Sequence, residues 1–93
     1  MHIGLLQIEL FLPGNQSLKG KRQIIKSIKD KVRNQTNVSI SEVDYHDAWQ
    51  QAQLAVVTVG TDHSRVSQVL ASVIKLIENT PGSEIINRQI EML

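Results

Sequence analysis

The sequence contains no cysteine, and this absence excludes several kinds of site. Disulfide bonds, zinc–thiolate centres and catalysis by a thiol all require cysteine, so none of them is available to this chain. Aromatic residues are also scarce, because Phe11, Tyr45 and Trp49 are the only three among 93 residues. Some RNA-binding domains stack bases on paired aromatic side chains across a sheet face, and we do not expect that mode here.

Long hydrophobic runs are absent as well. Residues 3–12 form an apolar tract that is too short for a membrane span and is interrupted by Gln7 and Glu9. The start of the chain lacks the basic region and the small-residue cleavage site of a signal peptide. We therefore expect a cytoplasmic protein with no membrane association. Residues 1–93 suffice for one domain, near the lower end of the size at which a core is adequate by itself.

No catalytic or metal-binding motif is recognisable. None of the three histidines, at positions 2, 46 and 63, is followed two, three or four residues later by a second ligand that would make a credible metal site. The segment from Asp44 to Asp47 puts two carboxylates beside a histidine, but a short polar segment of this kind is typical of a turn. Gly14 and Gly20 fit neither phosphate-binding fingerprint, and there is no nucleophile elbow. We predict no catalytic residue, cofactor or metal, and an enzyme acting on a phosphorylated small molecule is the least favoured hypothesis.

Charge is distributed very unevenly along the chain. Residues 17–34 contain seven basic residues and one acid, Asp30, whereas the remaining segments contain three basic and eight acidic residues. The formal net charge of the whole chain is only +1. A local positive field attracts polyanions even when the net charge is close to zero. The segment 17–34 is therefore the first place to look for a partner.

Alternation and turn signals predict six elements in the order β-α-β-β-α-β. The predicted strands are residues 3–12, 38–43, 54–59 and 84–93. Ser17 is expected to cap the first helix, which ends at 34–37, and Thr61 or Asp62 to cap the second, which stops before Pro81-Gly82. Two right-handed β-α-β units then interleave into an α+β, ferredoxin-like two-layer sandwich. It has a four-stranded antiparallel sheet with both helices on one face, and the apolar run 54–59 at its centre.

The first helix presents two separate faces. Ile24, Ile25, Ile28 and Val32 form its apolar face. Basic residues follow one another at steps of three and four, about 120° away, and form a ridge: Lys19, Arg22, Lys26, Lys29 and Arg33. The ridge is either a solvated helix surface that is rich in lysine or a binding surface for nucleic acid phosphates.

The sheet face that carries no helix is expected to be partly apolar. Such a patch on a small domain usually marks a partner surface, and we predict a homodimer formed through sheet faces or edge strands. The candidate interface residues are Leu5, Phe11, Val43, Trp49, Leu54 and Val56. We expect Trp49 to pack against a core edge or an interface rather than to stack on a base.

Several segments together resemble the YlxP-like family of small bacterial proteins, which is catalogued as a domain of unknown function. They are GLLQIELFLPGNQSLKGKRQIIKSIKDKV, NVSISEV, DAWQQAQLAVVTVGTD and the closing IEML. The resemblance covers essentially the whole chain and implies a ferredoxin-like fold in a bacterial cytoplasmic protein. Members are often encoded near translation-initiation and ribosome-maturation genes, so it also implies a role around the ribosome. Gly20 departs from the family, which commonly has Glu there to complete a capping box.

Two hypotheses follow. The leading one is a non-enzymatic accessory protein that contacts RNA or a ribosomal particle through the ridge on the first helix. The alternative is a homodimeric protein-interaction or ligand-sensing module that uses the open sheet face.

Overall fold

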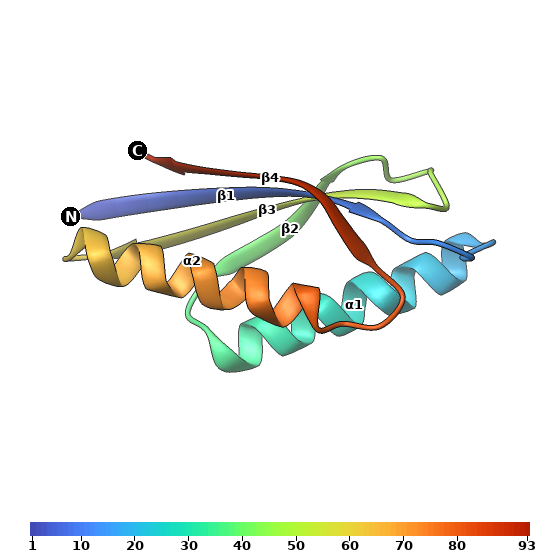
Figure 1. Ribbon diagram of the computed structural model, residues 1–93, viewed down its shortest axis with the longest axis horizontal. Coiled ribbons are helices and arrows are strands. Elements are labelled where there is room, and N and C mark those ends of the chain that lie inside the picture. The colour runs from blue at the N-terminus through green and yellow to red at the C-terminus, as the bar shows by residue number, and fades with distance from the viewer.

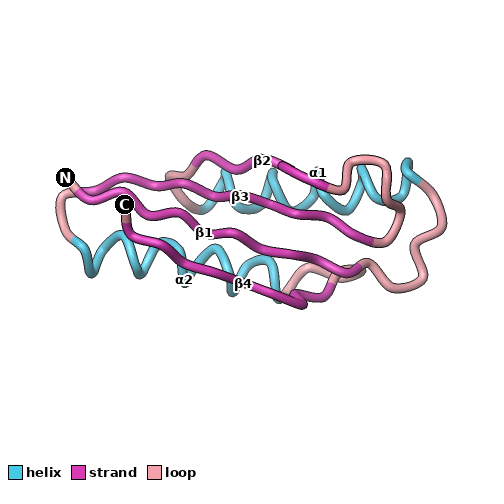
Figure 2. Tube along the Cα trace, turned by 90° about the horizontal axis from the view of Figure 1, so that it is seen from above, coloured by secondary structure: helices cyan, strands magenta, loops and turns pink.

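The computed structural model describes all 93 residues and has the predicted order of elements. These are β1 (His2–Phe11), α1 (Leu18–Gln35), β2 (Ser39–Asp44), β3 (Gln51–Gly60), α2 (His63–Glu78) and β4 (Glu84–Met92). The strands form one antiparallel sheet in the order β2-β3-β1-β4, and both helices cover the same face of it (Figures 1 and 2). The ferredoxin-like α+β prediction is confirmed.

β1 and β3 are the central strands, as predicted, but β3 is longer than the sequence indicated. It begins at Gln51 rather than at residue 54, because it pairs with β1 along its whole length, from Phe11↔Gln51 to His2↔Gly60. The added residues alternate between exposed or half-buried glutamines and the buried Ala52. This polar alternation continues the strand where the purely apolar run stops.

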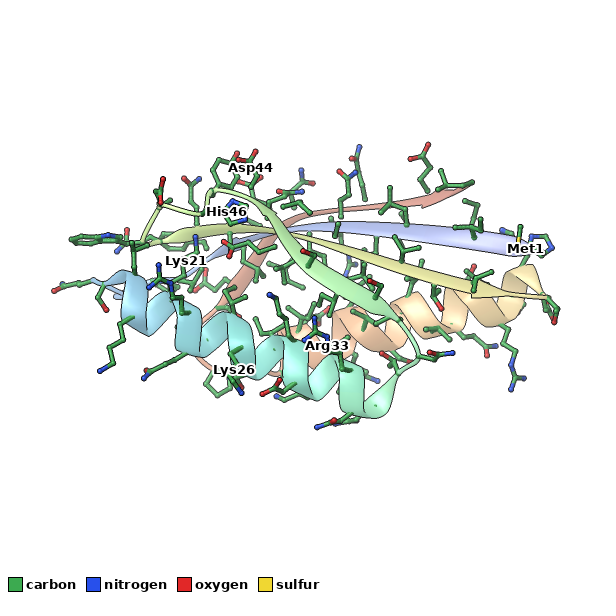
Figure 3. The ribbon with its side chains drawn as sticks, turned by 180° about the vertical axis from the view of Figure 1, so that it is seen from behind. Met1, Lys21, Lys26, Arg33, Asp44 and His46 are labelled. Carbon is green, nitrogen blue, oxygen red and sulfur yellow. The ribbon has the colours of Figure 1, made fainter.

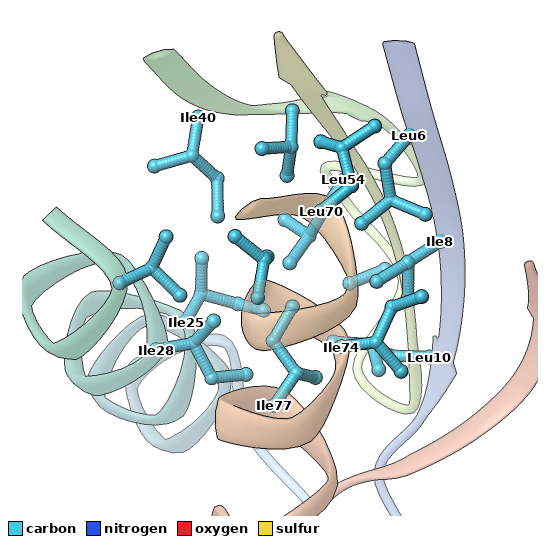
Figure 4. Packing of buried hydrophobic residues seen from close by; sticks show 14 of the residues in the cluster. Leu6, Ile8, Leu10, Ile25, Ile28, Ile40, Leu54, Leu70, Ile74 and Ile77 are labelled. Atoms are coloured by element: carbon cyan, nitrogen blue, oxygen red, sulfur yellow. The ribbon is translucent and has the colours of Figure 1, made fainter. Parts of the chain in front are cut away.

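The core lies between the sheet and the helices and consists almost entirely of aliphatic side chains (Figure 4). The prediction that Leu54 and Val56 lie on the open sheet face is wrong, since both are fully buried. Leu54 is opposite Ile8 and Val56 is opposite Leu6, so these side chains point toward the helices. The run 54–59 is apolar on both faces and therefore did not indicate which side is buried.

Each helix begins at a capping side chain. Ser17 Oγ accepts a hydrogen bond from the Gly20 amide at 3.0 Å, and Asp62, rather than Thr61, accepts one from the Ser64 amide at 2.9 Å. α2 packs very closely on β1 at Gly4. A Cβ atom at Gly4 would lie 2.7 Å from Val66 Cγ1, so only glycine fits there without a shift.

The molecule is elongated, with extents of 42, 21 and 17 Å along its principal axes. The two chain termini lie at one end, and the β1–α1 and β2–β3 loops lie side by side at the other (Figures 1 and 2). Neither helix is both long enough and apolar enough to cross a membrane.

Candidate nucleic-acid interface

Charge is separated between the two layers of the fold. The two helices contain nine basic and two acidic residues, whereas the four strands contain one basic and five acidic residues. The remaining two acids, Asp47 and Asp62, lie in loops. The nearly neutral chain therefore has a positive helix layer and a negative sheet layer, and the helix layer attracts polyanions.

All five residues of the predicted ridge lie on α1, and all but the half-buried Lys29 are exposed. At a rise of 1.5 Å per residue, the ridge spans about 21 Å from Lys19 to Arg33. Figure 3 shows Lys26 and Arg33 on this helix. Successive positions on the ridge are thus about 5 Å apart along the helix axis.

Two members of the ridge have partners within the protein. Lys26 Nζ lies 2.7 Å from Asp30 Oδ2, and Arg33 Nη2 donates a hydrogen bond to the Ile40 carbonyl at 3.2 Å. The hydrogen bond from Lys26 lowers the pKa of Asp30, and the positive charges of Lys26 and Arg33 lower it further. Lys19, Arg22 and Lys29 form no ion pair, so three cations of the ridge are available to an anionic ligand.

Lys21 is one of the seven basic residues of segment 17–34, but it does not contribute to the exposed positive charge. Its side chain is only 2% exposed; Nζ lies 2.9 Å from Glu42 Oε2 and donates a hydrogen bond to the Tyr45 carbonyl. Lys21 precedes Ile25 by four residues and Ile28 by seven, which places it on the buried stripe of α1. That spacing is the sequence signal that distinguishes it from the ridge lysines.

Hydrogen bonds join the start of α1 to the loop between β2 and β3. Asn15 Nδ2 donates to the Trp49 carbonyl at 2.6 Å and to the Ser17 carbonyl at 2.9 Å. Gln50 Nε2 donates to the Asn15 carbonyl at 3.2 Å, and the Leu12 amide donates to the Gln50 carbonyl at 2.9 Å. The β2–β3 loop is thereby held against the end of the molecule where the ridge begins.

Trp49 lies outside the buried core and is 53% exposed. Its predicted place in an interface stays a prediction. Tyr45, in the same loop, is 38% exposed and has a φ of 61°, which is uncommon for a residue other than glycine. Sequence reasoning singled out Trp49 but favoured packing over stacking on a base, because a lone tryptophan near a hairpin usually packs against its neighbours.

The open sheet face carries Leu5 and Phe11, both half-buried, as predicted. Val43 is the unpaired residue of a bulge in β2 and is exposed. Sequence reasoning missed Val57 and Val59, which face solvent on β3 and are 39% and 59% exposed. Val57 lies opposite Leu5 in the register, so these two residues lie in the half of the sheet nearer the chain termini, whereas Phe11 lies at the opposite end.

Comparison with known proteins gives the family. The family model described as "Protein of unknown function (DUF503)" matches residues 3–90. The chain belongs to this family. It is 34% identical over 82 residues to the uncharacterized protein YlxP of Bacillus subtilis (strain 168), covering 88% of this chain and 89% of that protein. The resemblance drawn from the sequence is confirmed.

Solved structures with a similar fold are much more distant in sequence. The de novo designed protein Foldit4 has a TM-score of 0.57 at 11% identity, covering all of this chain and 97% of that one. SnoaB, a cofactor-independent oxygenase from Streptomyces nogalater, has a TM-score of 0.54 at 9% sequence identity, and the match covers 99% of this chain and 90% of that one. A C-terminal segment of the alpha subunit of aIF2 from Pyrococcus abyssi has a TM-score of 0.54 at 14% sequence identity, and the match covers all of this chain and 49% of that one. At these identities the likeness concerns the fold alone.

The remaining titratable side chains form no further cluster. The rings of His2 and His63 meet edge to face with centroids 6.0 Å apart, near the chain start. No group of three or more His, Asp or Glu side chains is arranged to hold a metal ion. The ridge on α1, together with the loops at its start, stays the candidate site.

Proposed function

We propose that this protein is a non-enzymatic accessory factor that binds structured RNA, such as the RNA of a ribosomal particle, through the ridge on α1. The observation that carries the proposal is the segregation of charge. The basic ridge faces solvent on the helix layer, while most of the acidic residues lie in the strands and loops. A phosphate backbone approaching the helix layer meets Lys19, Arg22 and Lys29 without having to displace an internal partner.

The partners of the other two ridge residues do not prevent binding. The Lys26–Asp30 pair is exposed, with side-chain exposures of 76% and 50%, and exposed pairs of this kind contribute little to stability. A phosphate can therefore replace or share the contact with Lys26. Arg33 has further N–H groups that can donate to a phosphate while one nitrogen contacts Ile40.

Binding of a labelled RNA hairpin across a salt series, followed by fluorescence anisotropy, tests this function. If four or five phosphates are contacted, log K falls with log salt at a slope of about −3 to −4. The double variant Lys26→Glu/Lys29→Glu should bind more weakly, with a slope shallower by about 1 to 2. The test needs only the purified protein and the labelled hairpin, without ribosomal subunits.

The matched control is Arg65→Glu/Lys75→Glu, which makes the same change in net charge on exposed positions of α2. We expect it to weaken binding less than the ridge variant does. An equal loss would mean that the net charge of the helix layer, and not the ridge, determines binding. If wild type fails to bind RNA at near-physiological salt, the ridge is a solvated surface and the proposal is wrong.

A second candidate function, self-association through the open sheet face, is favoured by the exposure of Val57 and Val59. We infer that the occupant of this face is a second copy of the chain. A standard interface buries about 800 Å² per partner, so a dimer would have to use most of the sheet face, which extends along the 42 Å and 17 Å axes of the molecule (Figure 2). Sheet-to-sheet contact would also leave the ridge on the outside of the dimer.

Sedimentation equilibrium over micromolar concentrations tests self-association. Wild type is expected to be dimeric, and Val59→Glu should shift it to monomer because it buries a charge at the contact. Ala71→Glu, on the exposed surface of α2, is the matched control and should leave the dimer intact. A wild type that is monomeric at 100 µM, on the order of ten times a working concentration, would exclude this function.

A further inference from the structure

The few aromatic residues of this chain are gathered at one end of the molecule. Phe11 is the last residue of β1, while Tyr45 and Trp49 lie in the β2–β3 loop that follows β2. None of the three belongs to the buried core, which is built from aliphatic side chains alone. The fold therefore does not require an aromatic at position 49, where more than half of the indole contacts water. An exposed tryptophan of this kind is typical of binding surfaces.

The loop of residues 45–49, here called the aromatic loop, is held in one conformation by polar contacts. Asp44 Oδ1 accepts a hydrogen bond from the Tyr45 amide at 2.7 Å. The Tyr45 carbonyl accepts from the Ala48 amide at 3.0 Å and from the buried Lys21 ammonium. The Trp49 carbonyl accepts from the Asn15 side chain. A loop whose backbone is already ordered loses less conformational entropy when a ligand covers it.

The aromatic loop adjoins the start of the ridge. Asn15, which donates to the Trp49 carbonyl, lies against the first turn of α1, where a Cβ atom at Gly20 would come within 2.3 Å of its side-chain oxygen. The first ridge residue, Lys19, is next to Gly20 in sequence. Figure 3 shows Lys21 of α1 close to His46 of the aromatic loop. A polymer bound along the ridge thus passes the aromatic loop at this end.

The aromatic loop and the ridge differ in charge, so the ridge suits the phosphate of a nucleotide and the aromatic loop suits its base. Asp44 precedes the aromatic loop and Asp47 lies within it, and both disfavour phosphate there, whereas Lys19 and Arg22 attract it on the neighbouring helix. An aromatic ring stacks on any base, and a carboxylate accepts hydrogen bonds from the amino groups of base edges. The pattern suits a nucleotide whose base leaves the backbone path at the end of the ridge.

We propose that the aromatic loop stacks an unpaired base of the bound RNA on Trp49, so that the ligand is RNA with a single-stranded nucleotide adjoining the tract held by the ridge. This inference rests on the proposed RNA binding and adds the kind of RNA that is preferred. A base in a continuous duplex is stacked between its neighbours and does not present its face to the indole.

Trp49 is the only tryptophan, so its fluorescence reports on this contact alone. The probes are an RNA hairpin with a four-nucleotide adenosine tail, the same hairpin with an abasic tail, and the hairpin without a tail. We expect the adenosine tail to quench the fluorescence, and the other two probes to bind with little quenching. Trp49→Ala should weaken binding of the adenosine-tailed RNA about tenfold and leave the abasic-tailed RNA unchanged.

Trp49→Phe is the conservative control and should retain most of the preference for the adenosine tail, because phenylalanine also stacks on bases. Circular dichroism checks that each variant is folded. If all three RNAs bind alike to wild type and to Trp49→Ala, the ridge binds RNA and the stacking proposal is wrong. If none of them binds, the proposed RNA binding itself is wrong, and the stacking proposal is overturned with it.

Discussion

Two ion pairs connect the helix layer to the sheet layer, and they differ in their exposure to water and in their N–O distance. Lys21 of α1 and Glu42 of β2 are 2% and 17% exposed. Glu78 of α2 and Arg88 of β4 are both more than half exposed, with an N–O distance of 3.3 Å. Water therefore screens the second pair and is almost excluded from the first.

The comparison explains why one lysine is fully buried in a protein whose other lysines are exposed or half-buried. Lys21 serves the β2–β3 loop as well as Glu42, because its ammonium also donates to the Tyr45 carbonyl. Tyr45 has a positive φ, a conformation that costs of the order of 1 kcal/mol or more for a residue other than glycine. The buried ion pair thus orients the aromatic loop, whereas the Glu78–Arg88 pair only joins two surface side chains.

The largest expected effect is that of breaking the buried pair. Lys21→Met leaves the Glu42 carboxylate in a nearly dry site without its cation, and should lower the free energy of unfolding by about 3 kcal/mol. Equilibrium urea denaturation measures the change. Arg88→Met, the same substitution at the exposed pair, should alter stability by less than about 0.5 kcal/mol.

The double variant Lys21→Met/Glu42→Leu sharpens this test, because it removes both charges and fills the site with apolar groups. It should recover most of the stability that Lys21→Met loses. If the double variant is as unstable as the single one, the loss comes from the Tyr45 hydrogen bond and not from the unpaired carboxylate.

A smaller loss in the free energy of unfolding is expected when the helix and sheet layers are forced apart at Gly4. In Gly4→Ala the new methyl would lie 2.7 Å from Val66 Cγ1 and 2.8 Å from Leu70 Cδ1. Overpacking of this kind should lower the free energy of unfolding by about 2 kcal/mol. Gly60→Ala, whose Cβ would meet only Val66, at 3.0 Å, should cost less in the same urea experiment. Equal losses would show that α2 tilts away as a unit.

Features set by local spacing could be predicted from the sequence, whereas features set by contacts between distant segments could not. The order of the elements, the helix caps and the ridge depend on local spacing, and local spacing is visible in the chain. Whether Leu54 and Val56 face the helices or the open side depends on the register between β3 and β1, and the apolar run 54–59 gives no local preference for either face. The pairing of Leu54 with Ile8 and of Val56 with Leu6 determines that both face the helices.

The aromatic loop was unpredictable for a related reason. Its position depends on contacts between segments distant in sequence, such as Asn15 with Trp49, which are 34 residues apart. The burial of Lys21 was accessible in principle, since it lies four residues before Ile25 on the apolar stripe. The alternation of β2 places its partner Glu42 on the same side as Val38 and Ile40, but nothing local in the sequence indicates that Glu42 pairs with Lys21, which is 21 residues away.

The helix layer can be weakened without altering the sheet by removing a cap. Ser17→Ala loses the acceptor for the Gly20 amide and should lower the free energy of unfolding by about 1 kcal/mol. Ser72→Ala is the matched control, since the Ser72 hydroxyl contacts only a carbonyl within α2 and lies on an exposed position. It should change stability by less than about 0.5 kcal/mol in the same urea experiment. A loss as large as that of Ser17→Ala would show that the cap contributes nothing special.

The smallest effect concerns Asp30, the one acid within α1. Its pKa is lower in the folded protein than in the unfolded chain, because Lys26 donates a hydrogen bond to the ionised carboxylate. The contribution to stability is complete above the ordinary aspartate pKa of about 3.9 and is lost as the pH falls through the lowered folded value. Asp30→Asn should therefore flatten the rise in stability with pH in the acid range, below the ordinary aspartate pKa of about 3.9.

The same variant also tests whether the ridge acts as a phosphate surface. Asp30→Asn frees Lys26 and removes the nearest negative charge, so RNA affinity at pH 7 should rise by a small factor and the salt slope should steepen by up to about 1. Glu78→Gln removes an acid from α2, outside the ridge, and is the matched control. An equal gain in both variants would mean that RNA senses the charge of the whole helix layer. A gain confined to Asp30→Asn locates the phosphates on α1.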